Sequence, residues 1–399
     1  MSQRRIARSP DLLRLHEDGY HLELRGDVLL VHGVPYANPS RQVVRGTLVT
    51  DLELAGDVTA QPSNHVAYFI GEAPSTKEGV LLTSVVIGSA PTDVGTVRVD
   101  HTMSKKPQSD GQRYRDYHHK VETYIALISI HAQQIDPEVT ARTYPVIAPD
   151  PEEDDDSPFE YLDTSTTRNG LSDVSDKLRI GPVAILGLGG TGGYVLDLVA
   201  KTPVDAIHLW DGDRYVQHNA FRSPGAPSAD TLATVPQKVT YFAAIYGNMR
   251  KRIVPHDAYL TEDNVEELRE MSFVFVAVDD GPSRQVIITK LEEFGIPFID
   301  VGLGIEAVDG SLLGQVRTTL SSPRQRAHVH DNRRIPFGRV DGVNDDYKRN
   351  IQIAPLNMLN AALAVTKWLK HLGYLTDLER EHHSVYVTSG NVIINEDQS

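Results

Sequence analysis

The chain contains no cysteine among its 399 residues. This absence excludes disulfide bonds, zinc sites built from cysteine and cysteine nucleophiles from the sequence. Basic residues are also outnumbered, because 39 Lys and Arg stand against 54 Asp and Glu and give a formal net charge of −15. Contacts to phosphate backbones need clustered Lys and Arg, so this balance argues against nucleic acid and anionic membranes as partners.

Long apolar runs are missing as well. No run approaches the roughly 20 apolar residues that a membrane-spanning helix requires. The first ten residues, MSQRRIARSP, lack the apolar core of a signal peptide. We therefore expect a cytoplasmic protein without membrane segments. A length of 399 residues is too great for one ordinary core, so two domains are expected.

The first predicted domain covers residues 1–148 and has the pattern of a small α+β fold. Alternating apolar stretches predict a hairpin over residues 21–31 and strands over residues 65–70 and 80–87. Apolar and aromatic side chains recur every three or four residues between 113 and 134, which predicts a helix. His118 and His119 are expected on the surface of this helix rather than in a metal site. Partner binding is the default role of the domain, because it shows no catalytic set of residues.

An acidic, proline-flanked stretch follows. Residues 149–158 read PDPEEDDDSP, a run of like charge that repels itself and buries nothing. We expect residues 149–172 to form an extended or disordered linker.

The second predicted domain covers residues 173–399. Strands of the buried type are expected at residues 183–186, 207–210, 273–278 and 297–301, and helices at 194–200, 235–246 and 283–294. A strongly apolar helix is expected at residues 353–372. Strands that alternate with helices of about a dozen residues predict an α/β, Rossmann-like domain with a mostly parallel sheet.

A glycine-rich loop, GLGGTGG, occupies residues 187–193 between the first strand and its helix. Glycine permits a tight turn and lets backbone N–H groups approach a phosphate at the start of a helix. Gly187, Gly189, Gly190 and Gly192 are therefore the candidate nucleotide contacts.

Polar residues follow the next strands at the edge where open α/β sheets bind ligands. Asp211, which ends the second strand, suits a ribose, and this fits both NAD and ATP. A triphosphate also needs Arg and Lys for its charge and a carboxylate for Mg²⁺. The chain supplies that set, which favours MgATP: Asp213, Asn219, Arg222, Lys238, Asp279 and Asp280.

With these motifs, residues 183–317 resemble the ThiF/MoeB family, which includes the ubiquitin-activating enzymes. The shared pattern is a glycine loop, Asp-x-Asp, Asn and Arg eight and eleven residues after the first Asp, a Lys, and an Asp with an Arg five residues later. The pattern is met here by Asp211, Asp213, Asn219, Arg222, Lys238, Asp279 and Arg284. The spacing to Arg284 favours Asp279 over Asp280.

The resemblance implies roles for these residues. Asp211 would bind the ribose, Asp279 would bind Mg²⁺, and a set of three would position and neutralise the phosphates: Asn219, Arg222 and Lys238. It also implies a homodimer in which a partner arginine enters the site, for which Arg168 is a candidate. The implied activity is that of an ATP-dependent adenylyltransferase, in which a carboxylate attacks the α-phosphate.

Without cysteine, no thioester can form on these residues. The acyl group could pass directly to a partner or to a hydroxyl, for which Ser321 or Ser322 is a candidate, or the adenylate could be the end product. The polar, arginine-rich residues 323–349 lie where the family has a crossover loop, and they could grip a peptide tail or be a disordered loop. His328 and His330 lack further ligands in the sequence and are not expected to bind a metal.

The first domain resembles an uncharacterised domain that precedes ThiF-like domains in bacterial proteins found beside ubiquitin-like and ubiquitin-conjugating-enzyme-like proteins. The matching stretch runs from SKKP at 104–107 through the helix to TAR at 140–142. This implies a bacterial ubiquitin-like conjugation pathway with a role in antiviral defence. The leading hypothesis is adenylation of the carboxyl terminus of a ubiquitin-like protein. The alternatives are adenylation of a small molecule, peptide or tRNA base, nucleotide sensing without catalysis, and, last, an NAD-dependent oxidoreductase.

Overall fold

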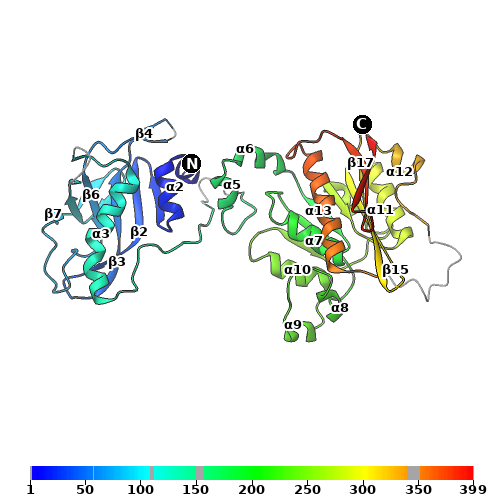
Figure 1. Ribbon diagram of the computed structural model, residues 1–399, viewed down its shortest axis with the longest axis horizontal. Helices are drawn as coiled ribbons and strands as arrows, with labels where there is room; N and C mark the ends of the chain where they lie inside the picture. The colour runs from blue at the N-terminus through cyan, green and yellow to red at the C-terminus, as the bar shows by residue number, and fades with distance from the viewer. Residues whose placement is uncertain (1, 57, 108–111, 150–155, 339–350, 399) are drawn as a thin grey trace. The chain divides into compact units, whose positions relative to one another are not determined.

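A computed structural model describes all residues except 1, 57, 108–111, 150–155, 339–350 and 399. The chain forms two compact units, residues 1–147 with 163–171 and residues 148–162 with 172–399. Each unit is described by itself (Figure 1). None of the helices in the described part of the chain combines the length and apolarity that a membrane crossing requires.

The first unit is built on a six-stranded antiparallel sheet in the order β1-β2-β3-β6-β10-β7. Its strands are β1 (His21–Arg25), β2 (Val28–Ala37), β3 (Val43–Asp51), β6 (Val66–Ile70), β7 (Val86–Gly88) and β10 (His101–Ser104). Two small strand pairs accompany the sheet, β4 (Leu54–Ala55) with β5 (Val58–Thr59) and β8 (Thr92–Val94) with β9 (Val97–Val99). The helices are α1 (Ser2–Arg8), α2 (Pro10–Glu17), α3 (Tyr117–Ile135) and α5 (Thr164–Arg168).

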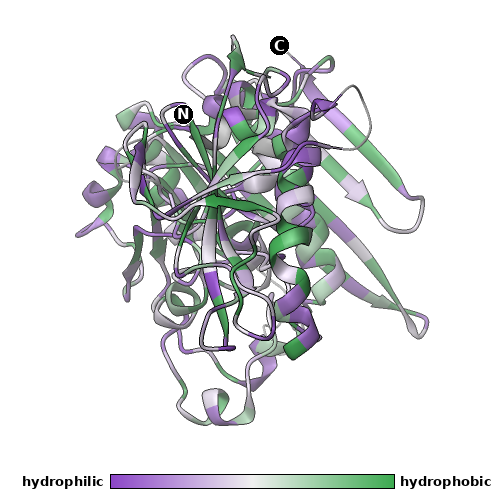
Figure 2. Ribbon diagram, turned by 90° about the vertical axis from the view of Figure 1, so that its left-hand side faces the viewer, coloured by the Kyte–Doolittle hydropathy of each residue, from purple (hydrophilic) through white to green (hydrophobic). Residues whose placement is uncertain are grey.

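The helix α3 supplies much of the core of this unit. Tyr117, Val121, Tyr124 and Ile128 recur along one side of it and are all fully buried, as the spacing predicts. The predicted hairpin is also confirmed, because β1 pairs with β2. In Figure 2 hydrophobic stretches run along the strands and alternate with hydrophilic ones along the helices.

The predicted strand over residues 80–87 is wrong for most of its length. Only Val86–Gly88 is a strand. The backbone N–H groups of Val85 and Val86 both bond to the carbonyl of Leu82 and close a local turn. The apolar run therefore contributes Leu82 and Val85 to the core from outside the ladder, and only Val86 joins the ladder, opposite Met103.

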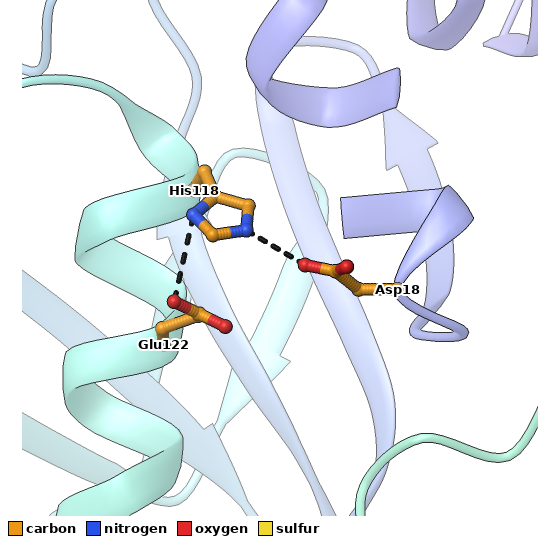
Figure 3. A group of neighbouring side chains, drawn as sticks. All are labelled: Asp18, His118 and Glu122. Carbon is orange, nitrogen blue, oxygen red and sulfur yellow. Dashed lines mark hydrogen bonds and ion pairs between the residues drawn. The ribbon is translucent and has the colours of Figure 1, made fainter. Parts of the chain in front are cut away.

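The surface position expected for His118 is also wrong. Only 4% of His118 is exposed, and its Nε2 lies 2.8 Å from Oδ2 of Asp18, which caps the end of α2 (Figure 3). Its Nδ1 lies 3.6 Å from Oε2 of Glu122, one turn along α3, and Arg142 lies 3.3 Å from the other oxygen of Glu122. These three acid and imidazole groups are close enough to share a cation, but Arg142 already offsets part of their charge. The cluster is therefore accounted for as a network that joins α2, α3 and the segment around Arg142.

The second unit is built on an eight-stranded sheet in the order β13-β12-β11-β14-β15-β16-β17-β18. The first five strands in this order are parallel: β13 (Ile253–His256), β12 (Ile207–Trp210), β11 (Val183–Leu186), β14 (Phe273–Val276) and β15 (Phe298–Val308). The last three continue antiparallel: β16 (Ser311–Ser321), β17 (Glu381–Val387) and β18 (Val392–Gln398). The predicted Rossmann-like α/β fold with a mostly parallel sheet is confirmed, with an antiparallel extension.

Helices cover both faces of this sheet. One face packs against α7 (Gly190–Val199), α10 (Lys238–Tyr246) and α13 (Ala354–His371), and the other against α11 (Gly281–Phe294), α12 (Ala327–Asp331) and the 3-10 helix η3 (Val265–Glu270). The shorter helices of the unit are α6 (Ser172–Ser175), η2 (Asp176–Leu178), α8 (Gln217–Ala220) and α9 (Ala229–Ala233). The alternation along β11 shows the two faces, because Val183 and Ile185 belong to one core and Ala184 and Leu186 to the other.

The predicted linker is partly folded. Its acidic residues 150–155 lie outside the described part of the chain. Beyond them, Ser157 is 3% exposed, and the carbonyl of Pro158 accepts a hydrogen bond from the backbone of Lys251 in the second unit. Residues 163–171 belong instead to the first unit. Residues 157 and 158 are therefore ordered against the folded chain and are not disordered.

Candidate functional site

The predicted site residues come together at one edge of the parallel sheet. Strand β11 pairs in parallel with β12 on one side and β14 on the other, and Leu186 is in register with both Trp210 and Val276. The loops after these three strands therefore leave the sheet side by side. Since the strand order reverses at β11, this is the switch point where open α/β sheets form a crevice.

The glycines of the first loop differ in what surrounds them. An added Cβ would lie 1.9 Å from Nδ2 of Asn357 at Gly190 and 1.8 Å from the carbonyl oxygen of Gly187 at Gly192. Gly187 has a φ of +86° and lies against the carbonyl of Ala277. Gly189, the N-cap of α7, has nothing within 4 Å of that position. Packing therefore requires three of the four glycines, and Gly189 is the one with open space beside it.

Asp211 ties the second strand to the glycine loop. It is 7% exposed, and its Oδ2 accepts a hydrogen bond of 2.6 Å from the backbone of Leu188. Its Oδ1 accepts one of 2.8 Å from the backbone of Asp213. The carboxylate predicted to bind a ribose thus also positions the loop, a role that spacing alone does not reveal.

Lys238, the first residue of α10, lies between two carboxylates. Its Nζ is 3.2 Å from Oδ2 of Asp211 and 2.6 Å from Oδ2 of Asp213, and the residue is 5% exposed. The hydroxyl of Tyr259 donates to the other oxygen of Asp213. Burial raises the pKa of Asp213, but the bonds from Lys238 and Tyr259 outweigh it and hold that pKa below its usual value. The charge of Lys238 is therefore already shared between two carboxylates.

Asn219 and Arg222 lie in and just after α8. The side-chain oxygen of Asn219 accepts from the backbone of Val216 at 2.9 Å, which closes the first turn of the helix. The Nε of Arg222 is buried without a hydrogen-bond partner among the described residues, and its charge helps to lower the pKa of Asp213. A buried donor without a partner is costly, so this guanidinium fits an anion placed beside it.

The two aspartates in the loop after β14 have different surroundings. Asp280 is the N-cap of α11 and accepts from the backbone and hydroxyl of Ser283 at 2.9 and 2.6 Å. Asp279 stands one residue earlier, and its charge is close enough to raise the pKa of Tyr259. The choice of Asp279 over Asp280 as a metal ligand stays a prediction from the spacing to Arg284.

Arg284 of α11 stabilises the loop after β14. Its guanidinium donates to the carbonyl of Val278 and, at 2.9 Å, to that of Pro336, and its Nε lies 3.1 Å from the fully buried Asp300. Pro336 belongs to the predicted crossover segment, of which residues 339–350 lie outside the described part. Arg284 thus links the loop that contains Asp279 to the segment that contains Pro336.

The structure changes several expectations that were based on the sequence. Ser321 is fully buried and Ser322 is 3% exposed, so neither hydroxyl is placed to accept an acyl group. In the described residues 323–338 the segment is folded rather than disordered, since His328 is buried and bonds the carbonyl of Leu320. His330 lies 2.9 Å from a carboxylate oxygen of Glu292.

Arg168, the candidate for an arginine from a partner copy, ends α5 in the first unit, whereas the site lies in the second.

Two residues of the site were not predicted from the sequence. Asn357 of α13 is fully buried, accepts from Thr191 at 3.0 Å and donates to the carbonyl of Arg222 at 3.1 Å, so it links the glycine loop to the arginine. The available signal was a polar residue on the apolar face of a helix. Tyr259 follows the edge strand β13, which was not expected from the sequence.

Family models match both parts of the chain. The model described as "ThiF family" matches residues 167–391, and the model described as "Domain of unknown function (DUF6791)" matches residues 10–164. Ubiquitin-like modifier-activating enzyme 5 of Gallus gallus is 24% identical over 173 residues, which are 41% of this chain and 43% of that protein. The protein of the same name from Rattus norvegicus is 22% identical over 169 residues, which are 40% and 42%. The matches thus cover about two fifths of the length of these relatives.

Two solved structures each match part of this chain. The structure of PaaA has 16% sequence identity and a TM-score of 0.43, and the match covers 56% of this chain and 75% of that one. The structure of E. coli MccB with ATP has 18% identity and a TM-score of 0.44, and the match covers 59% of this chain and 71% of that one.

Proposed function

Because this chain belongs to the ThiF family, as its motif spacing indicated, we propose that its second unit binds MgATP and adenylates a carboxylate. The observation that carries the proposal is the convergence of five groups at one sheet edge. These are Gly189, which has open space beside it, the two carboxylates of Asp211 and Asp279, and the cations Arg222 and Lys238.

The charges of this edge suit a triphosphate with a metal ion. The partnerless Nε of Arg222 supplies a donor for a phosphate oxygen, and the helix that begins after Gly189 adds its positive end. Lys238 adds a second cation when it leaves Asp213. Asp279 would hold Mg²⁺, which neutralises charge on the phosphates when bound.

The reaction needs little covalent chemistry from the protein. A substrate carboxylate is ionised near neutral pH, and one of its oxygens attacks the α-phosphorus in line. A bond forms between that oxygen and phosphorus, the bond to the β-phosphate oxygen breaks, and pyrophosphate leaves. Lys238 and Arg222 would offset the charge that moves to the leaving group, so catalysis is positioning plus charge neutralisation.

We assign the carboxyl terminus of a ubiquitin-like protein as the substrate. Two of the relatives carry the name ubiquitin-like modifier-activating enzyme. The antiparallel extension of the sheet also exposes apolar side chains, a feature that suits a protein partner better than a small molecule. These half-exposed residues lie on β15, β16 and β18: Val308, Leu312, Leu313, Val392, Ile393 and Ile394.

Further partners follow from the family resemblance. A homodimer would allow Arg168 of one copy to act at the site of the other. A ubiquitin-conjugating-enzyme-like protein would take the activated carboxyl group, within a bacterial conjugation pathway. Light scattering on the purified protein tests the dimer directly.

The decisive experiment is ATP–pyrophosphate exchange with and without a purified ubiquitin-like protein. Exchange should require that protein and should stop when its terminal glycine is removed. Asp279→Asn should lower exchange at least about a hundredfold, because charge stabilisation of this kind is worth several kcal/mol. The control Asp263→Asn changes an exposed carboxylate elsewhere in the unit and should leave exchange intact. Exchange that survives Asp279→Asn would contradict the proposed metal site.

A further inference from the structure

Tyr259 is an exposed aromatic residue held firmly at the edge of the site. It is 62% exposed, although burial usually keeps an aromatic ring in place. Its backbone carbonyl accepts a hydrogen bond of 3.0 Å from the side chain of Asn264, and the next residue, Leu260, is buried in the core. The side chain is therefore anchored at its base and projects from the end of β13.

The ring is fixed at its outer end as well. Its hydroxyl donates to Oδ1 of Asp213, the carboxylate that also contacts Lys238. The ring lies against Gly212, where an added Cβ would be 2.7, 2.8 and 3.0 Å from three of its atoms. Any side chain at residue 212 would therefore push the ring away.

The surroundings of the ring are the carboxylates of the proposed nucleotide site. The hydrogen bond to Asp213 is the largest cause that raises the pKa of Tyr259, to about 12, and the charges of Asp211 and Asp279 add to it. The ring therefore lies near both the carboxylate proposed for the ribose and the one proposed for the metal.

We propose that Tyr259 is the surface on which the base of the bound nucleotide stacks, while its hydroxyl holds Asp213 beside the ribose. This inference rests on the proposed nucleotide site. A nucleotide has a charged end and a flat apolar end, and Arg222 and Gly189 suit only the first. An exposed tyrosine ring offers the flat face that the second requires, and the hydrogen bond and Gly212 pre-organise it.

The test compares ATP with tripolyphosphate, which carries charge but no base. Binding of each, with Mg²⁺, is measured by calorimetry for the wild type, Tyr259→Ala and Tyr259→Phe. Tyr259→Ala should weaken ATP binding roughly ten- to a hundredfold, the usual range for a lost base–aromatic stack. It should leave tripolyphosphate binding unchanged. Tyr259→Phe keeps the ring and should lose less than about tenfold.

Gly212→Ala gives an independent check. The added methyl group should displace the ring and weaken ATP binding in the wild-type background, but it should have no further effect in Tyr259→Ala. Phe221→Ala removes a rival ring, 78% exposed beside Arg222. A loss confined to Phe221→Ala would overturn the assignment.

The outcomes separate this inference from the proposed function. Wild-type protein that binds neither ligand would refute the nucleotide site itself. Wild-type protein that binds ATP no more tightly than Tyr259→Ala does would refute the role of Tyr259 alone. Equal losses for ATP and tripolyphosphate would show that the ring acts on the phosphates or the fold, and would overturn base stacking.

Discussion

Two neighbouring glycines allow the packing and ligand roles of the loop to be measured separately. Gly189 and Gly190 are adjacent, and the same substitution to alanine can be made at both. At Gly190 the new Cβ would lie 1.9 Å from Nδ2 of Asn357 and 2.8 Å from the carbonyl oxygen of Arg222. At Gly189 it would meet nothing within 4 Å.

The expected losses of stability differ accordingly. Gly190→Ala forces Asn357 away, and overpacking of this kind costs about 1–3 kcal/mol. Asn357 also loses its bonds to Thr191 and to the Arg222 carbonyl, each worth about 1 kcal/mol. The free energy of unfolding should fall by about 3–5 kcal/mol in total. Gly189→Ala should cost less than about 1 kcal/mol, because it only replaces a moderate N-cap residue with a poor one.

Tryptophan fluorescence during denaturant unfolding measures these losses. The chain has two tryptophans, Trp210 and Trp368, which are buried in the second unit and report on it alone. A separate titration with MgATP should show weaker binding to Gly189→Ala than to the wild type, because the methyl group would occupy the space of a phosphate. Equal destabilisation by the two substitutions would refute the packing argument. Unchanged ATP binding by Gly189→Ala would refute the phosphate contact.

Two predictions concern the first unit. Burial lowers the pKa of Lys120, which is 2% exposed, to about 8. An unfolded lysine keeps a pKa near 10.4, so above pH 8 the unfolded state binds more protons and stability rises with pH. Between pH 7.5 and 9.5 the free energy of unfolding should rise by about 2 kcal/mol. Hydrogen exchange of the α3 amides, corrected for intrinsic rates, measures this rise. Lys120→Met should abolish it. His118→Ala should lower the free energy of unfolding measured at the same amides by about 1–3 kcal/mol, because the bond to Asp18 is lost. His119 is less buried, and His119→Ala should cost little. Equal effects of the two substitutions would contradict the role of the buried network.

The α/β half was the more predictable part of the fold, for a physical reason. Its parallel strands are buried on both faces, so they appear in the sequence as short apolar runs, and β11 and β12 match the predicted ranges. The edge strand β13 contains Pro255, which weakens the pattern and is tolerated because one side of an edge strand lacks a partner. Strand β17 begins with Glu381, whose charge is balanced by Lys367 of α13. A compensation of this kind is invisible along the sequence.

The candidate site was predictable in its residues more than in their contacts. Spacing identified Asp211, Lys238 and Asp279, and the structure places all three at one sheet edge. It could not show that Lys238 rests on two carboxylates. Nor could it show that Asn357 of α13 contacts the carbonyl of Arg222, 135 residues earlier in the chain. Such contacts depend on which helix covers the sheet edge, and periodicity carries no information about that.

The lack of cysteine and the position of Ser321 together limit where an activated acyl group could go. Ser321 pairs with Phe298, the first residue of β15, and therefore lies at the amino-terminal edge of the parallel strands. The proposed site lies at their carboxyl-terminal edge, after Leu186, Trp210 and Val276. A fully buried hydroxyl at the opposite edge of the sheet cannot attack an adenylate formed there, and these 399 residues contain no thiol to replace it. This excludes Ser321 and any thiol of this chain as the acceptor, so on the proposed function we place the acceptor on another molecule. The strands with exposed apolar side chains, β15, β16 and β18, belong to the same unit as the site that this molecule would reach.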